Sequence, residues 1–307
     1  MTTSRPCKTL VAVLGATATG KTEVAVRLAQ AFGTEIVSSD SRQVYREMNI
    51  GTARPEPEEL AAVPHHFIGT RSVREDYSAG RYAEEALQRI GELFEKHDLV
   101  LLAGGSGLYI DAVCDGMDSL PPADGELREE LTRKAREGGL APLLERLRTL
   151  DPVYYAEVDR NNPQRVVRAL EVCLQTGKPY SGFRRRMPAA RPFDVIRVGI
   201  RMPRPILYER IDRRVDRMME RGLEREARSL YPLRDCNALQ TVGYRELFEY
   251  FDGRIDLPRA VELVKRNSRR YAKRQQTWFG RDDRIRWFDG GEGCAAAIES
   301  YLREAIR

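Results

Sequence analysis

The feature that most constrains this chain is the stretch GATATGKT at residues 15–22. Its spacing is that of a P-loop, in which glycines let backbone amides surround a phosphate group at the start of a helix. An apolar, β-branched run at residues 9–14 (TLVAVL) precedes it, and residues 22–31 (TEVAVRLAQA) carry apolar side chains at helical spacing. The order strand, glycine loop, helix therefore predicts a phosphate-binding site.

This loop supplies two kinds of phosphate ligand and one ligand for a metal ion. Gly15 and Gly20 let backbone N–H groups crowd round an anion at the positive end of a helix dipole. The Lys21 ammonium adds a point charge, and the Thr22 hydroxyl is a ligand for magnesium. The other interpretation is a glycine-rich turn without a ligand, but the full eight-residue pattern between a strand and a helix favours the phosphate site.

Further strand candidates recur at residues 35–38 (EIVS), 99–103 (LVLLA) and 196–200 (IRVGI), with helical stretches between them. Near-continuous apolar strands separated by helices are typical of a parallel sheet covered on both faces. We therefore predict an α/β fold of the P-loop NTPase-like kind, a parallel sheet flanked by helices. Beyond these strands the chain is mainly helical, apart from the short segment 285–288.

The middle of the chain differs, because it carries amphipathic helical segments and no convincing strand. Those segments are residues 126–137, 141–150 and 163–176. A chain of 307 residues also exceeds the usual size of a single domain. We predict a catalytic core with basic C-terminal helices, formed by residues 1–119 and 193–307, and a mainly helical insertion domain formed by residues 120–192.

Composition limits the class of protein. With 42% hydrophobic and 32% charged residues the chain is an ordinary globular sequence, and no run approaches the roughly 20 apolar residues of a membrane helix. The N-terminal residues lack the apolar stretch of a signal peptide, so we expect a cytoplasmic protein without a membrane segment. The five cysteines are scattered without a CxxC pair, which favours reduced thiols over disulfides or zinc.

Positive charge is concentrated near the C-terminus. The whole chain has a formal charge of +5, but residues 259–286 hold ten basic and three acidic residues, a local excess of seven. Tyr271, Trp278 and Phe279 lie among these charges, and cations mixed with stacking surfaces are typical of nucleic-acid binding. A solvated basic helix face is the alternative, and for a charge run taken alone it is the commoner case.

The acidic residue that many P-loop enzymes use for magnesium is missing from its usual place. The run 99–109 (LVLLAGGSGLY) ends in glycines rather than in Asp, so its amides and the Ser106 hydroxyl suit anion contact or close packing. Asp40 is the better candidate, because it follows the strand 35–38 at the carboxyl edge where open α/β sheets bind ligands. Capping of a following helix is the alternative role for Asp40.

Nine short stretches in order along almost the whole chain are informative together. They are GATATGKT (15–22), SSDSRQVY (38–45), IGTARP (50–55), PHHFIG (64–69), AGGSGLY (103–109), NNPQRVVRALEV (161–172), TGKPYS (176–181), QTVGYREL (240–247) and RYAKRQQTWF (270–279). In this combination the chain resembles the tRNA dimethylallyltransferase family. The resemblance implies transfer of a dimethylallyl group from dimethylallyl diphosphate to the exocyclic N6 amine of the adenine adjacent 3′ to the anticodon, with release of diphosphate.

The resemblance also implies a cofactor, Mg²⁺, a partner, the tRNA anticodon stem-loop, and roles for three catalytic residues. Asp40 is the general base for the amine, while Thr22 and Arg214 act on the diphosphate. The residues implied for binding the diphosphate are Gly15, Ala16, Thr17, Ala18, Thr19, Gly20, Lys21 and Thr22.

Arg214 belongs to an arginine-rich helical segment, residues 208–223. Arg210, Arg217 and Arg221 share a helical face with Arg214, whereas Arg213 lies about 100° round the helix. The choice of Arg214 comes from the resemblance. The alternative is an exposed helix whose arginines pair with the acidic residues Asp212, Asp216, Glu220 and Glu224.

For the RNA, the resemblance implies contacts in several parts of the chain. The residues are Asp40, Ser41, Arg42, Gln43, Ser106, Arg128, Gln164, Arg165, Val166, Val167, Arg168, Gln240, Gly243, Tyr244, Arg245, Lys273, Arg274, Gln275 and Trp278. A target adenine has to leave its stack to reach a buried donor. Neutralisation of phosphates by the basic residues should make the binding depend strongly on salt.

The chain departs from the family pattern at three positions. Ala16 stands where proline is usual, and Ser106 replaces threonine but keeps the hydroxyl. Gly280 replaces a common arginine, which puts that tRNA contact in doubt. The adjacent His65 and His66 look like metal ligands, but without a neighbouring carboxylate or cysteine in the sequence a structural role is favoured.

Two other functions stay open. A small-molecule P-loop kinase fits the predicted fold but does not explain the basic, aromatic C-terminal segment, and it would turn over ATP without tRNA. A non-enzymatic RNA-binding nucleotide switch would bind GTP or ATP without forming a product. For the favoured transferase we expect a monomer.

Overall fold

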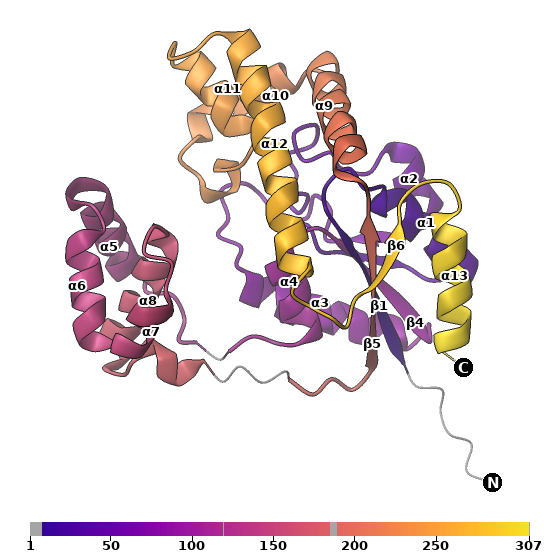
Figure 1. The fold of residues 1–307 in the computed structure, drawn as a ribbon, viewed down its shortest axis with the longest axis horizontal. Coiled ribbons are helices and arrows are strands. Elements are labelled where there is room, and N and C mark those ends of the chain that lie inside the picture. Colours follow the sequence, from indigo (N-terminus) through magenta and orange to yellow (C-terminus); the bar gives the residue numbers. More distant parts are fainter. Residues whose placement is uncertain (1–7, 119, 185–188, 307) are drawn as a thin grey trace. The chain divides into compact units, whose positions relative to one another are not determined.

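The computed structural model describes residues 8–118, 120–184 and 189–306. Contacts divide the chain into two compact units (Figure 1). We call residues 1–115 with 190–307 the core unit and residues 116–189 the helical unit. Each is described by itself.

Six parallel strands form the sheet of the core unit. They are β1 (Thr9–Gly15), β2 (Ile36–Ser38), β3 (His65–His66), β4 (Leu99–Gly104), β5 (Asp194–Arg201) and β6 (Arg286–Asp289). Their order is β3-β2-β4-β1-β5-β6, and every neighbouring pair is parallel. The predicted α/β fold is confirmed. The apolar pattern did not predict β3, because its two residues are both histidines at the edge of the sheet.

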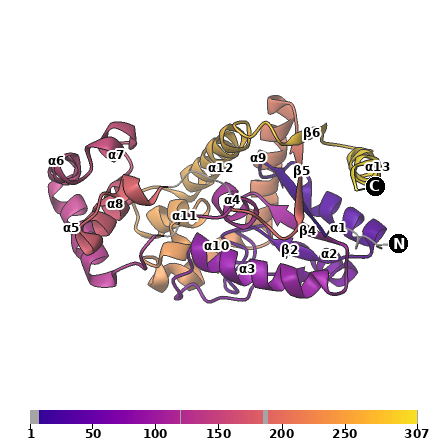
Figure 2. The ribbon, with the colours of Figure 1, turned by 90° about the horizontal axis from the view of Figure 1, so that it is seen from below.

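The sheet is covered on both faces, which explains why its central strands are apolar throughout. On β1, Val11 and Val13 point into a core that they share with α1 (Lys21–Phe32) and α13 (Cys294–Ala305). Leu10 and Leu14 point into the opposite core, together with residues of α3 (Ala79–Phe94) and α4 (Gly107–Cys114). Figure 2 shows both helices beside the sheet. Because the strands are parallel, the loops after β1, β2 and β4 meet at one edge of the sheet.

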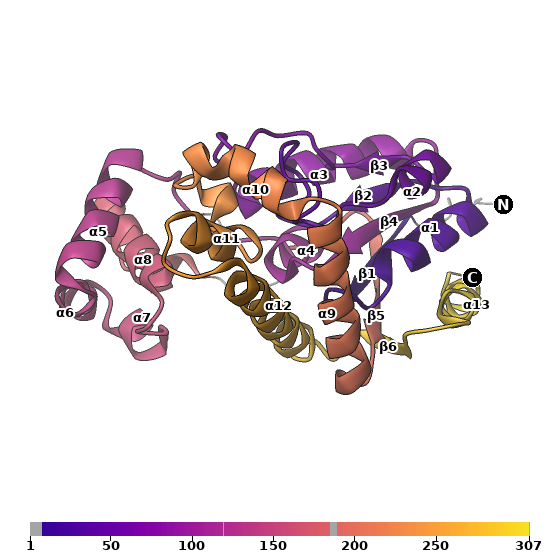
Figure 3. The same cartoon turned by 90° about the horizontal axis from the view of Figure 1, so that it is seen from above.

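The helices of the C-terminal half also belong to the core unit. They are α9 (Arg204–Glu220), α10 (Leu223–Leu230), α11 (Tyr244–Phe251) and α12 (Leu257–Phe279), with one 3₁₀ turn at Tyr231–Leu233 and another at Asn237–Leu239. Helices α9 and α12 lie side by side (Figure 3). Two ion pairs of 2.5 Å join them, Lys265 Nζ to Asp216 Oδ1 and Arg269 Nη1 to Asp212 Oδ1. The short α2 spans Pro57–Ala62.

A buried ionic network ties the end of α12 to the sheet. Arg197 on β5 is only 6% exposed, and its Nη2 lies 2.7 Å from Asp115 Oδ1. Its Nε lies 3.4 Å from Asp282 Oδ2, and Arg284 contacts the same two carboxylates. Removal of Arg197 would therefore leave acids that are drawn together around its guanidinium.

The helical unit contains α5 (Gly125–Gly138), α6 (Ala141–Leu150), α7 (Pro152–Glu157) and α8 (Pro163–Thr176), followed by a 3₁₀ turn at Tyr180–Phe183. Its own apolar core includes Leu131, Leu147 and Leu170. The helical periodicity did not predict α7, because this helix has only six residues. Asp151, fully buried, caps it by accepting a hydrogen bond from the amide of Tyr154.

Two further sequence expectations concern membranes and thiols. Among the described residues, no helix combines the length and the apolarity that crossing a bilayer requires. Cys114, Cys173, Cys236 and Cys294 are free thiols, while Cys7 lies outside the described residues.

Candidate active site

The loop between β1 and α1 has the geometry of an anion cradle. Gly15 has a φ of +151°, and a Cβ there would lie 2.7 Å from the carbonyl oxygen of Ile200, so no larger residue fits. Ala18 has a left-handed φ of 66°, a strained conformation that is common at ligand sites. Within the described chain, the amides of Ala18, Gly20, Lys21 and Thr22 have no protein hydrogen-bond acceptor. These four N–H groups are available to an anion at the start of α1.

Lys21 is held against its own loop. Its Nζ donates a hydrogen bond of 2.6 Å to the carbonyl oxygen of Ala16. Burial and the nearby Arg214 lower the pKa of Lys21 to about 8, against the opposing effect of Asp40. A cation that is costly to charge in the free protein is well placed to be neutralised by an anionic ligand.

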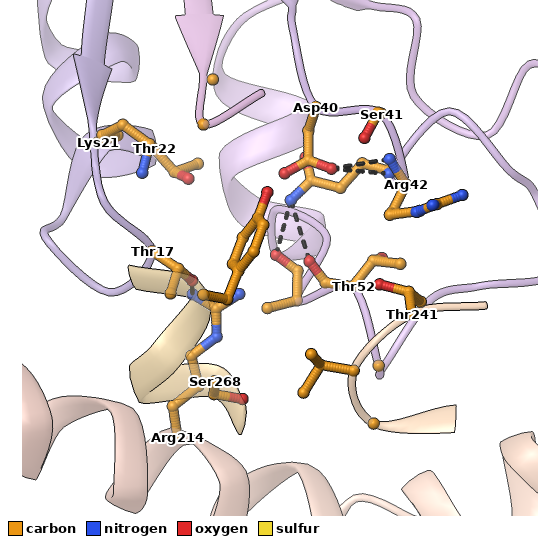
Figure 4. A pocket seen from close by; sticks show the side chains of 18 of the residues that line it. Thr17, Lys21, Thr22, Asp40, Ser41, Arg42, Thr52, Arg214, Thr241 and Ser268 are labelled. Atoms are coloured by element: carbon orange, nitrogen blue, oxygen red, sulfur yellow. Dashed lines mark hydrogen bonds between the residues drawn. The ribbon is translucent and has the colours of Figure 1, made fainter. Parts of the chain in front are cut away.

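Arg214 on α9 reaches the same loop. Its Nη1 donates a hydrogen bond of 3.1 Å to Thr17 Oγ1 (Figure 4). Burial lowers the pKa of Arg214 to about 10; Asp40 opposes the shift and Arg217 adds to it. Among the described residues no carboxylate forms an ion pair with Arg214. Its guanidinium therefore stays available for an anion.

The other charges of α9 explain why Arg214 is unpaired. Asp212 and Asp216 bind cations of α12, so the alternative interpretation, in which they pair with arginines of their own helix, is wrong for these two acids. Arg213 lies 3.3 Å from Glu209, and Arg221 pairs with Glu56.

Asp40 follows β2 and uses its two carboxylate oxygens differently. Oδ1 accepts hydrogen bonds from the amides of Arg42 at 2.9 Å and Gln43 at 3.2 Å (Figure 4). Oδ2 has no hydrogen-bond donor among the described residues. A turn and not a helix follows Asp40, so the helix-capping interpretation is wrong; one oxygen caps this turn, and the second remains free to accept a proton or to bind a ligand.

A cavity of about 400 Å³ brings these groups together. Its wall combines the loop after β1, the loop after β2, residues of α9 and α12, and the segment before α11 (Figure 4). The predicted site residues that line it are Thr17, Lys21, Thr22, Asp40, Ser41, Arg42, Gln43, Arg214, Gln240, Gly243, Arg245, Arg274 and Gln275. Polar groups predicted from stretches far apart in the sequence therefore meet in one place.

A second cavity of about 1170 Å³ shares Lys21, Thr22 and Arg214 with the first. It is lined by Arg210 and Arg213 as well, so the residue assigned to a different helical face, Arg213, also borders it. Cations near the P-loop thus border both cavities, whereas Asp40 lines only the first.

Several residues predicted to contact RNA are buried. Val166 and Val167 lie in the core of the helical unit, and Tyr244 is 0% exposed, donating its hydroxyl to Glu226. Ser106 is 9% exposed and binds Ser41. These side chains pack inside the protein.

Other predicted RNA residues reach the surface, at least in part. Gln164, Arg165, Gln240, Arg245, Lys273 and Arg274 are exposed. Trp278 is half-buried and donates its indole N–H to Asp111 at 2.9 Å. Arg128 and Arg168 both pair with the fully buried Glu171, which fixes their direction.

One part of the cavity wall received no functional role from the sequence. It is the segment 49–55, whose amides at Asn49, Ile50 and Gly51 all donate to the Glu226 carboxylate at 2.8 to 3.0 Å. The stretch IGTARP was already part of the family resemblance, and this was the available signal. The anchor on Glu226 holds the segment against both cavities.

The residues present fit a magnesium ion. The Thr22 hydroxyl opens into the cavity beside the P-loop, and hydroxyl, phosphate and water oxygens are hard ligands that suit Mg²⁺. The described residues contain no group of three or more His, Cys, Asp or Glu able to hold a metal by themselves. Diphosphate and water oxygens would therefore complete the coordination.

The adjacent histidines have structural partners. His65 Nδ1 lies 2.8 Å from the carbonyl oxygen of Val63. His66 Nε2 lies 2.7 Å from Glu35 Oε2, a carboxylate that the sequence neighbourhood of the histidines does not contain. His97 lies 3.5 Å from the other oxygen of Glu35.

The chain is similar to known proteins over most of its length. The family model described as IPP transferase matches residues 43–282. A tRNA dimethylallyltransferase 2 of Porphyromonas gingivalis is 54% identical, over 91% of this chain and 93% of that protein. A tRNA dimethylallyltransferase 1 of Bacteroides fragilis is 49% identical, over 98% of this chain and 99% of that one.

Solved structures give the same result. The crystal structure of a tRNA isopentenylpyrophosphate transferase from Bacillus halodurans is 39% identical, covers 97% of each chain and has a TM-score of 0.72. A eukaryotic dimethylallyltransferase acting on tRNA shares the fold, with a TM-score of 0.80 at 24% identity, over 97% of this chain and 77% of that one. The predicted resemblance is confirmed, because relatives named tRNA dimethylallyltransferase are similar to this chain over almost their whole length. The chain belongs to the IPP transferase family.

Proposed function

We propose that the protein transfers a dimethylallyl group from dimethylallyl diphosphate to the N6 amine of the adenine adjacent 3′ to the anticodon of tRNA, with release of diphosphate. The observation that carries this proposal is that the P-loop, two cations without carboxylate partners and the free oxygen of Asp40 border one cavity. The names of the relatives supply the chemistry of donor and acceptor.

The donor diphosphate binds to the four free amides of the P-loop, with its charge met by Lys21 and Arg214. Thr22 would hold Mg²⁺, which would supply further positive charge to the diphosphate. Thr17 and Arg214, already joined by a hydrogen bond, lie where negative charge develops on the departing oxygen. This part of the site stabilises a leaving group and needs no attacking water.

The acceptor adenine enters from the side of Asp40. The N6 nitrogen attacks the first carbon of the dimethylallyl group, the carbon–oxygen bond breaks, and its electron pair leaves with the diphosphate. The proton of the amine passes to Asp40 Oδ2, which has no other donor among the described residues. Extrusion of the base from its stack exposes this amine to the cavity.

The exposed cations of α12 bind the phosphates of the anticodon stem-loop. Lys273 and Arg274 are exposed, and the described structure places no carboxylate in an ion pair with either. In the helical unit, Arg128, Gln164 and Arg165 are exposed, and Arg168 is half-buried beside Glu171. These side chains of the helical unit contribute to RNA binding by neutralising phosphates. The proposal also includes a monomer that acts in the cytoplasm.

Transfer is tested with purified protein, Mg²⁺, undermodified tRNA and labelled dimethylallyl diphosphate. Digestion to oligonucleotides and mass spectrometry should find one dimethylallyl group per tRNA, on the adenine next to the anticodon. ATP without tRNA is the control for a kinase. Absence of the adduct, or rapid ATP turnover, would contradict the proposal.

A further inference from the structure

Gln275 on α12 is a buried amide in a helix whose neighbouring residues face solvent. Gln275 is only 6% exposed, whereas Lys273, Arg274 and Thr277 are exposed. Both ends of the amide have partners inside the protein. Oε1 accepts a hydrogen bond of 2.8 Å from the amide of Thr17, and Nε2 donates one of 2.8 Å to the carbonyl oxygen of Gly105.

These two bonds join three elements that lie far apart in the sequence. Thr17 belongs to the P-loop, Gly105 to the loop after β4, and Gln275 to the basic helix α12. A main-chain N–H and a main-chain carbonyl leave one orientation for the amide, with its oxygen toward Thr17 and its nitrogen toward Gly105. Gln275 therefore fixes the distance between the P-loop and the neighbouring loop.

The contact is closely fitted at the Gly105 end. A Cβ on Gly105 would lie 2.3 Å from Nε2 of Gln275. Any side chain at this position would displace the amide, because real Cβ atoms do not approach other atoms so closely. The main chain of the loop after β4 is thus matched to the glutamine.

Thr17 is held by two hydrogen bonds from different helices. Its main-chain N–H is used by Gln275, and its hydroxyl accepts a hydrogen bond from Arg214 Nη1 at 3.1 Å. One residue of the P-loop is therefore held from two sides, by α12 through its main chain and by α9 through its side chain. Because Thr17 is held in place, the main chain that follows it, from Ala18 to Thr22, is held in place as well.

We propose that Gln275 is a positioning residue for the donor diphosphate, acting through Thr17, and not a contact to RNA. This inference rests on the proposed function, since it concerns the same phosphate site. Although Gln275 borders the cavity, both polar ends of its amide are occupied by main-chain groups of the protein, so binding of RNA to the exposed cations beside it requires no hydrogen bond from Gln275.

The test compares Gln275→Ala with Gln276→Ala, the adjacent glutamine, which is half-buried and makes no side-chain hydrogen bond in the described structure. Calorimetry measures binding of inorganic diphosphate with Mg²⁺, and fluorescence anisotropy measures binding of an anticodon stem-loop. Gln275→Ala should weaken diphosphate binding about tenfold or more, because the P-loop loses one of its anchors. It should change RNA binding less than twofold, and Gln276→Ala should change neither.

A second pair of variants distinguishes positioning from a general loss of stability. Gly105→Ala should weaken diphosphate binding in the wild-type background, since it displaces the amide. In the Gln275→Ala background the same change should have no further effect, because the clash has been removed. If Gln275→Ala unfolds, Gln275→Met replaces it, because methionine fills a similar volume without either hydrogen bond; it should weaken diphosphate binding to a similar extent.

Two outcomes would overturn the inference. One is a loss of RNA affinity in Gln275→Ala with diphosphate binding unchanged. The other is full additivity of the Gly105 and Gln275 substitutions. Both binding measurements are independent of transfer activity, so a wild-type protein that binds diphosphate without modifying tRNA would refute the proposed function alone.

Discussion

Replacement of Asp40 by asparagine separates the two tasks of its carboxylate. Asparagine keeps Oδ1 as an acceptor for the amides of Arg42 and Gln43, at 2.9 and 3.2 Å in the native protein. The turn after β2 should therefore survive, with a change in unfolding free energy below about 0.5 kcal/mol. Asp40→Ala loses both bonds and should cost about 1–3 kcal/mol.

The effect on the reaction should be much larger than the effect on stability. An amide at the Oδ2 position cannot take the proton of the amine, and loss of a general base typically lowers the rate about 10² to 10⁴-fold. Binding of the donor should be unchanged or tighter, because a negative charge has been removed from a cavity that receives an anion. The predicted signature is a low rate with normal substrate affinities.

Single-turnover transfer with saturating donor and RNA measures this rate. Asp98→Asn is the matched control, since Asp98 is an exposed carboxylate that pairs with Lys8. Thermal unfolding checks that Asp40→Asn stays folded. A folded Asp40→Asn protein with a rate within tenfold of the wild type would remove Asp40 from the mechanism.

Three other predictions follow from the charges. In the protein without a ligand the pKa of Lys21 is about 8, and a bound anion raises it. Above pH 8 binding therefore takes up a proton, and diphosphate affinity falls as the pH rises. Calorimetry should show this pH dependence in the wild type and not in Lys21→Arg. Arg214→Met should weaken diphosphate binding about tenfold or more in the same assay, while Arg213→Met, which removes an exposed partner of Glu209, should change it less than threefold. Arg197→Met should lower the unfolding free energy measured in urea by about 3–5 kcal/mol, and a loss below 1 kcal/mol would show that Arg284 alone compensates the acids.

Local patterns were sufficient for the apolar strands of the sheet and for the phosphate loop. The residues of β1 are apolar because the strand is buried on both faces, and the loop that follows needs glycine at position 15 because Ile200 approaches it. Asp40 could be placed at the same edge, since parallel strands end together. The predictions themselves used only residues close in sequence, whereas the approach of Ile200 to Gly15 is known from the structure.

Contacts between distant residues could not be predicted in this way. The bond between Thr17 and Gln275 joins positions 258 apart, and no periodicity or spacing connects them. Likewise, helical geometry left several arginines of α9 as candidates. Arg214 is distinguished only when α12 binds Asp212 and Asp216 and leaves its guanidinium directed at Thr17.

The burial of some predicted RNA contacts could not be predicted either, because it depends on how the helices of the unit pack together. Val166 and Val167 lie in a stretch that resembles the family, yet they pack in the core of the helical unit. A family motif includes buried residues that support a surface as well as exposed residues that form it. The sequence does not separate these two groups, because both depend on the same helix.

The central claim is that the P-loop holds a departing diphosphate beside a flipped adenine. A crystal structure with an anticodon stem-loop and a non-reactive thio analogue of dimethylallyl diphosphate tests it most directly. Diphosphate oxygens should accept hydrogen bonds from the amides of Ala18, Gly20, Lys21 and Thr22, and the N6 amine should lie within hydrogen-bonding distance of Asp40 Oδ2. An analogue bound away from the loop, or an adenine that stays stacked in the RNA, would contradict the account.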